Sequence, residues 1–77
     1  MSLILKLEAM AGDTIEDTCY EMVSIASKLN ICVQVKFNDV TLMSYWGGDA
    51  HQLVQSFKDE VGTDRRFKFV STHGNRQ

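Results

Sequence analysis

Residues 31–46, ICVQVKFNDVTLMSYW, decide the fold of this 77-residue chain. Two runs of alternating apolar and polar residues flank Asn38-Asp39, which is the pattern of a β-hairpin with a two-residue turn. Asn and Asp tolerate the positive φ that a type I′ turn requires at both central positions. The cross-strand pairs that this turn predicts are Phe37–Val40, Lys36–Thr41, Val35–Leu42, Gln34–Met43, Val33–Ser44, Cys32–Tyr45 and Ile31–Trp46.

The predicted register divides the hairpin into an apolar face and a mixed face, because successive side chains of a strand point to opposite sides. A slip of one residue would turn the apolar set toward water, so the register should be firm. The apolar face is expected in the core. The mixed face carries Cys32, Gln34, Lys36, Thr41, Met43 and Tyr45.

The segments outside the hairpin indicate a strand and a helix before it, and a helix and a strand after it. The strands alternate over residues 3–8 and 65–72. Apolar residues at helical spacing follow Asp13 or Thr14 in one segment and Asp49 in the other, and these residue types cap helices. The expected core positions are Ile15, Cys19, Met22, Val23, Ala26 and Leu29 in the first helix, Ala50, Leu53, Val54, Phe57 and Val61 in the second, and Phe67 and Phe69 in the last strand.

The predicted order β-α-β-β-α-β is that of the ferredoxin-like open-faced sandwich. We expect an α+β fold with an antiparallel four-stranded sheet in the order 4-1-3-2 and both helices on one face. Residues 1–72 would form the single domain, and residues 73–77 a frayed polar tail. At 44% hydrophobic, with no apolar run of the ~20 residues that a membrane helix needs and no signal-peptide pattern, the chain is expected in the cytoplasm.

The second face of such a sheet is uncovered, and its mixture of apolar and charged residues is typical of an interface. We therefore expect a protein partner or a second copy to bind there, most simply as a homodimer. Nucleic acid is disfavoured, because Tyr45 is the one ring expected on the central strands of this face. The expected interface residues are Ile4, Cys32, Gln34, Lys36, Met43, Tyr45, Arg66 and Lys68.

An alternative ligand site surrounds the two glycines before the second helix. Backbone N–H groups at a helix start suit an anion, although no Lys-Ser/Thr pair follows and Asp49 would repel a phosphate. Together with the first loop, these residues could line a cleft between subunits. The residues of this alternative are Gly12, Trp46, Gly47, Gly48 and His51.

No residue cluster indicates catalysis, a metal or a cofactor. Cys19 is expected buried and Cys32 more exposed, on opposite sides of the sheet, so both are expected to be reduced thiols without a matching base. Carboxylates gather at the hairpin-tip end, but they have capping and turn roles and lack EF-hand spacing. These carboxylates are Asp13, Glu16, Asp17, Asp39 and Asp64.

Three families show partial resemblances. Residues 26–30 and 40–44 locally resemble the phosphocarrier protein HPr, but residues 11–17 lack that family's phosphorylated histidine, so its function is not carried over. Residues 35–42, VKFNDVTL, with the following helix resemble small phage and prophage accessory proteins, which implies a non-enzymatic protein that binds or inhibits a host or phage component. The element order and Gly12 resemble ACT-type regulatory domains, which implies a metabolite-binding homodimer.

The sequence therefore predicts a small non-enzymatic binding module that acts through protein–protein interaction. The alternative is an ACT-like regulatory module that binds a small ligand as a homodimer.

Overall fold

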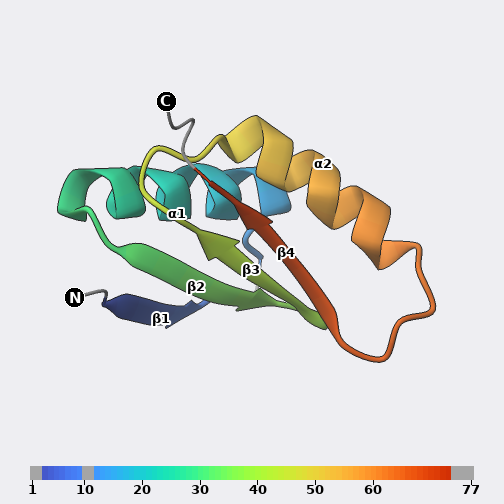
Figure 1. Ribbon diagram of the computed structural model, residues 1–77. Coiled ribbons are helices and arrows are strands. Elements are labelled where there is room, and N and C mark those ends of the chain that lie inside the picture. The colour runs from blue at the N-terminus through green and yellow to red at the C-terminus, as the bar shows by residue number, and fades with distance from the viewer. Residues whose placement is uncertain (1–2, 10–11, 74–77) are drawn as a thin grey trace.

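The computed structural model describes residues 3–9 and 12–73. Along the chain these residues form a strand, a helix, two strands, a second helix and a last strand, as the sequence predicts (Figure 1). The elements are β1 (Ile4–Glu8), α1 (Ile15–Leu29), β2 (Cys32–Phe37), β3 (Val40–Ser44), α2 (Ala50–Val61) and β4 (Lys68–Thr72). Neither helix is long and apolar enough to cross a bilayer in this part of the chain.

The sheet is mixed and its strands lie in sequence order, β1-β2-β3-β4. β1 runs parallel to β2 and β3 runs parallel to β4, while β2 and β3 form an antiparallel hairpin. The predicted antiparallel ferredoxin-like sheet with order 4-1-3-2 is therefore wrong. Each helix instead returns the chain to the strand directly beside the one that it left, so that two β-α-β units are joined through the central hairpin. Both helices cover the same face of the sheet (Figure 1).

The hairpin has the predicted register, with Phe37 opposite Val40 and Val35 opposite Leu42. Its turn differs from the expected type I′, because Asn38 has a φ of 55° while Asp39 does not have a positive φ. The two central residues still join Phe37 to its partner Val40, so the register is unaffected.

The core lies between the sheet and the helices. From the hairpin it takes Val33, Val35, Val40 and Leu42, and the helices contribute Cys19, Met22, Ala26, Ala50, Leu53, Val54 and Phe57. Leu29 and Val61 are exposed, contrary to the sequence prediction. Each is the last residue of its helix, where no further turn packs over it.

The helix ends follow the capping signals. The Thr14 side chain accepts a hydrogen bond from the backbone N–H of Asp17, and the Asp49 carboxylate accepts from the backbone N–H groups of His51 and Gln52. Asn30 ends α1 in the left-handed conformation, with a φ of 55°. These caps satisfy backbone groups that have no partner inside the helix.

β4 presents the opposite face from the one that its sequence suggested. Val70 pairs with Leu42 and is buried in the core, whereas Phe69 pairs with Thr41 and is 53% exposed. Phe67 is 84% exposed. Alternation shows which residues share a face, but the pairing with β3 decides which face turns to α2. The smaller Val70 and Thr72 pack there, and the phenylalanines do not.

Candidate functional site

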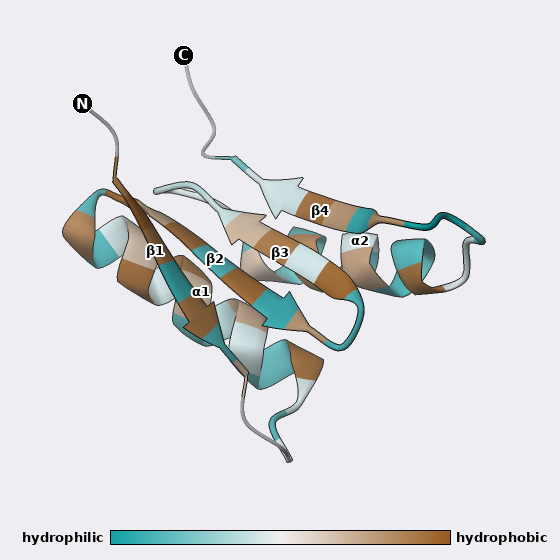
Figure 2. Ribbon diagram, turned by 90° about the horizontal axis from the view of Figure 1, so that it is seen from below, coloured by the Kyte–Doolittle hydropathy of each residue, from teal (hydrophilic) through white to brown (hydrophobic). Residues whose placement is uncertain are grey.

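The face of the sheet opposite the helices is uncovered. We call it the open face, and Figure 2 views the sheet from this side with both helices behind it. Ile4 on β1 and Phe69 on β4 are 52% and 53% exposed at its two edges. By strand register, the open face comprises Ile4, Lys6, Glu8, Cys32, Gln34, Lys36, Thr41, Met43, Phe69 and Ser71.

Two apolar side chains lie in the middle of the open face. Cys32 and Met43 lie on the two central strands and are buried by their neighbours, although they face away from the helices. Tyr45, directly after β3, stacks on His73, directly after β4, with ring centroids 4.2 Å apart and an interplanar angle of 15°. Ser71 Oγ lies 3.4 Å from His73 Nε2. The rings of Tyr45 and His73 thus border the middle of the open face on the β3–β4 side.

Six of the predicted interface residues keep their expected place. Ile4, Cys32, Gln34, Lys36 and Met43 lie on the open face by register, and Tyr45 continues the same alternation. Arg66 lies in the loop before β4 begins, and Lys68 was wrongly placed on the open face. It pairs with Val40 of the core face, and its Nζ donates to the carbonyl oxygen of Val61 at the end of α2, 3.2 Å away. Sequence reasoning missed Phe69, Ser71 and His73, because it assigned β4 the opposite face.

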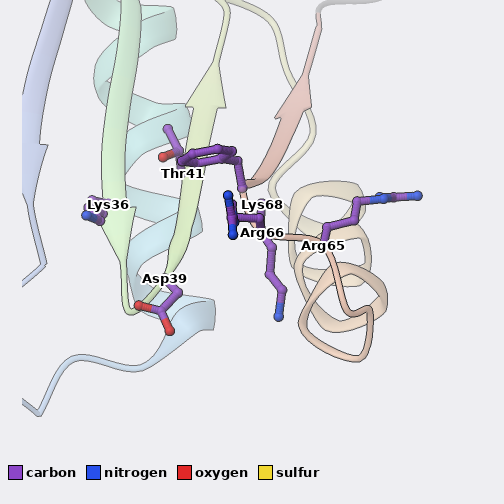
Figure 3. Close-up of a pocket in the computed structure, with 7 residues that line it drawn as sticks. Lys36, Asp39, Thr41, Arg65, Arg66 and Lys68 are labelled. Atoms are coloured by element: carbon purple, nitrogen blue, oxygen red, sulfur yellow. The ribbon is translucent and has the colours of Figure 1, made fainter.

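A cationic hollow lies at the hairpin-tip end of the sheet (Figure 3). Its volume is about 340 Å³. Among the described residues, four cations and one carboxylate surround it, so that its lining is positively charged although the chain has a net charge of −2. The lining residues are Lys36, Asp39, Thr41, Arg65, Arg66, Phe67 and Lys68.

Two of the four cations around the cationic hollow are committed elsewhere. Arg65 extends away from the hairpin (Figure 3), and its Nη1 lies 2.6 Å from Oε1 of the nearly buried Glu60. Lys68 Nζ donates to the carbonyl oxygen of Val61 at the end of α2. Among the residues that the structure describes, Lys36 and Arg66 have no ion-pair or hydrogen-bond partner for their cationic groups. These two side chains are therefore available to an anion.

The predicted ligand site at the glycine pair is occupied by internal hydrogen bonds. The backbone N–H of Gly47 donates to Ser27 Oγ, that of Gly48 to the carbonyl oxygen of Tyr45, and that of Asp49 to Thr72 Oγ1. These amides hold the loop against α1 and β4, so they do not point at an anion. Trp46 and His51 remain partly or fully exposed beside the loop.

Gly12 does not join the other residues of that predicted site. It follows β1, whose C-terminal residue Glu8 pairs with Lys36 near the hairpin tip. The glycine pair follows Ser44 at the opposite end of the sheet. The cleft that the ACT-like resemblance implied would therefore have to draw on both ends of the sheet.

Carboxylates do not form a metal-binding group in the described residues. The first loop, the hairpin tip and the loop after α2 do lie at one end of the sheet, as expected, because β1, β2 and the start of β4 meet there. The carboxylate that sequence reasoning missed is Glu60. It is buried beside Arg65 and fixes the loop between α2 and β4.

Both cysteines are buried and unpaired. Cys19 lies in the core as predicted, and burial, followed by the nearby Glu16 carboxylate, raises its pKa to about 11. Cys32 was expected to be more exposed, but its neighbours on the open face cover it. A buried thiol with a raised pKa is a poor nucleophile at neutral pH, because the thiolate is the reactive form.

The raised pKa of Cys19 predicts a loss of stability in alkali. Between its ordinary pKa of 9.0 and the folded value of about 11, the unfolded chain loses the thiol proton while the folded chain keeps it, so unfolding is favoured as the pH rises. We expect Cys19 to contribute a loss of about 2–3 kcal/mol across this range. Urea unfolding of wild type and Cys19→Ala measures it. The stability advantage of wild type should shrink as the pH rises, and a constant difference would contradict the prediction.

Comparisons with protein-family models, with curated proteins and with solved structures found no match to this chain.

Proposed function

We propose that this chain is a small binding module that acts through protein–protein interaction, with a second copy of the chain as its partner on the open face. The observation that carries the proposal is the composition of this face. It combines two apolar residues in the middle, Cys32 and Met43, which neighbouring side chains largely cover, with exposed large side chains, Ile4 and Phe69, at its edges. Apolar centres with aromatic residues and a charged surround are typical of interfaces.

The charges on the open face favour self-association over an acidic or basic partner. Lys6 and Glu8 lie on the same side of β1, and Glu8 lies opposite Lys36 of β2 in the strand register. In a two-fold arrangement the same patch meets its own copy, so a patch that carries both signs can be complementary to itself. A binding role also agrees with the resemblance of the hairpin to phage accessory proteins.

Replacing the exposed apolar residues of the open face is expected to weaken the proposed dimer. Ile4→Thr and Phe69→Thr each remove apolar contact area while keeping a residue that suits a strand. We expect each change to weaken association about tenfold or more, as is usual for large side chains within an interface. Size exclusion with light scattering over a concentration series measures the dissociation constant.

A matched control lies on the helical side of the molecule. Tyr20 on α1 is 62% exposed, and Tyr20→Ala removes a similarly exposed ring far from the open face. Its dissociation constant should equal that of wild type. The proposal fails if wild type stays monomeric at about 1 mM, where even weak dimers form, or if Tyr20→Ala weakens association as strongly as Phe69→Thr.

A further inference from the structure

We propose that the cationic hollow binds a nucleotide, with the phosphate held by Lys36 and Arg66 and the base stacked on Phe67. This site is distinct from the middle of the open face, and its two ends require different chemistry. The phosphate end needs cations without other partners. The base end needs an aromatic ring with a free face.

We infer the phosphate end from the partners of the four cations around the hollow. Glu60 holds Arg65 and the end of α2 holds Lys68, so these two side chains fix the loop before β4 and do not turn inward together. Lys36 reaches the hollow from β2 and Arg66 from that fixed loop, on opposite sides (Figure 3). Arginine and lysine without protein partners are the usual ligands of phosphate oxygens. The hydroxyl of Thr41, opposite Lys36 on β3, adds a donor.

The base end follows from the exposure of Phe67. A phenylalanine that is 84% exposed contributes almost nothing to the core, yet this residue lines the same hollow as the two available cations. Aromatic rings next to cations are the arrangement by which proteins stack bases while neutralising the phosphates. The sequence disfavoured nucleic acid because Tyr45 was the one ring expected on the central strands, while Phe67 and Phe69 were expected inside. The structure instead exposes both phenylalanines.

Asp39 is the one carboxylate that the described residues contribute to the lining of the hollow. It accepts hydrogen bonds, so it suits the hydroxyl groups of a ribose or an amino group of a base, and it opposes a bare phosphate by charge repulsion. A lining of this kind therefore discriminates in favour of nucleotides over inorganic phosphate. Asp39→Asn removes this negative charge and should therefore strengthen phosphate binding, whereas the loss of a cation should weaken it.

The test is a titration of the full chain with three probes: AMP, a single-stranded oligoadenylate and inorganic phosphate. Amide NMR spectra of the chain monitor binding at each step. AMP should shift the amides of residues 36–41 and 65–69 in a saturable way, and phosphate should bind more weakly. If the oligoadenylate binds much more tightly than AMP, the ligand is a nucleotide within a single strand. If the two affinities are equal, the ligand is the free nucleotide. Absence of a saturable response to both AMP and the oligoadenylate would overturn the proposal, as would phosphate binding as tightly as AMP.

Variants separate stacking from charge. Phe67→Leu should weaken the binding of AMP about tenfold and leave the binding of phosphate unchanged, as expected for the loss of one stacked base. Arg66→Gln should weaken both probes, whereas Lys28→Gln, which removes the same charge from an exposed position on α1, should weaken neither. Equal losses from Arg66→Gln and Lys28→Gln would mean a diffuse charge effect and would overturn the site. The oligomeric state of Phe67→Leu should match wild type, so failure of this site is distinguishable from failure of the dimer.

Discussion

Replacing Phe57 by alanine is expected to lower the free energy of unfolding by about 3–5 kcal/mol, the usual cost of removing a buried phenylalanine. Phe57 lies on the core side of α2, and its ring meets that of Phe37 edge to face, with centroids 5.4 Å apart and an interplanar angle of 88°. The truncation would remove this contact and leave a cavity between α2 and the hairpin. A domain of this size has little stability to spare, so much of the chain should unfold.

The matched control for Phe57 is the same substitution at Phe67. Because Phe67 is exposed, Phe67→Ala should change the free energy of unfolding by no more than about 0.5 kcal/mol. Urea unfolding followed by circular dichroism gives both values. Similar losses at the two positions would mean that Phe67 packs in the core, and this would contradict the orientation of β4.

A methyl group at Gly48 is expected to cost about 1–3 kcal/mol of stability, as other forms of overpacking do. A Cβ at this position would lie 2.7 Å from Cγ2 of Thr72 and 3.1 Å from the carbonyl oxygen of Tyr45. Thr72 is fully buried and its hydroxyl accepts from the backbone N–H of Asp49, so it cannot turn away without breaking that hydrogen bond. The loop must move instead.

Gly62 provides the control for Gly48, because it lies at the end of α2 with a φ of −82° and ample space. A Cβ there would meet only the carbonyl oxygen of Asp59, at 3.8 Å. Gly62→Ala should therefore be neutral or raise stability by about 0.4–1 kcal/mol, since it restricts the unfolded chain. Thermal unfolding of the two alanine variants should shift in opposite directions or, at the least, differ clearly. Equal melting temperatures would show that the loop before α2 is not close-packed.

The elements and the hairpin register were predictable because each depends on neighbouring residues. Two short residues between alternating runs set the pairing of Phe37 with Val40, and Thr14, Asn30 and Asp49 mark helix ends by local hydrogen bonding. Strand order does not depend on neighbouring residues in this way. A helix can return the chain beside the strand that it left or one strand further away, and the periodicity of α1 and α2 is the same in both cases.

The candidate sites were less predictable than the fold because they depend on one face assignment. Arg66, Phe67, Lys68 and Phe69 alternate whichever way β4 turns, and the larger apolar residues were assigned to the core. The pairing of Val70 with Leu42 reverses this assignment and exposes the rings. Likewise, the backbone N–H groups of Gly47 and Asp49 donate to hydroxyls that are distant in the sequence, so they are not available at the expected anion site. No local sequence pattern predicts these hydrogen bonds.

The sequential order of the strands also bears on how quickly the chain can fold. Every strand pairs with the strand before or after it in the chain, and the separation from Ile4 to its partner Cys32 is the same as that from Val40 to Lys68. Contacts between near neighbours in the chain close small loops, which costs less entropy in the transition state than joining distant strands. The hairpin can form first, within microseconds in isolated hairpins, and offer each of its two edges to one β-α-β unit. The two halves then need not wait for each other, and neither must thread past the other to reach its place.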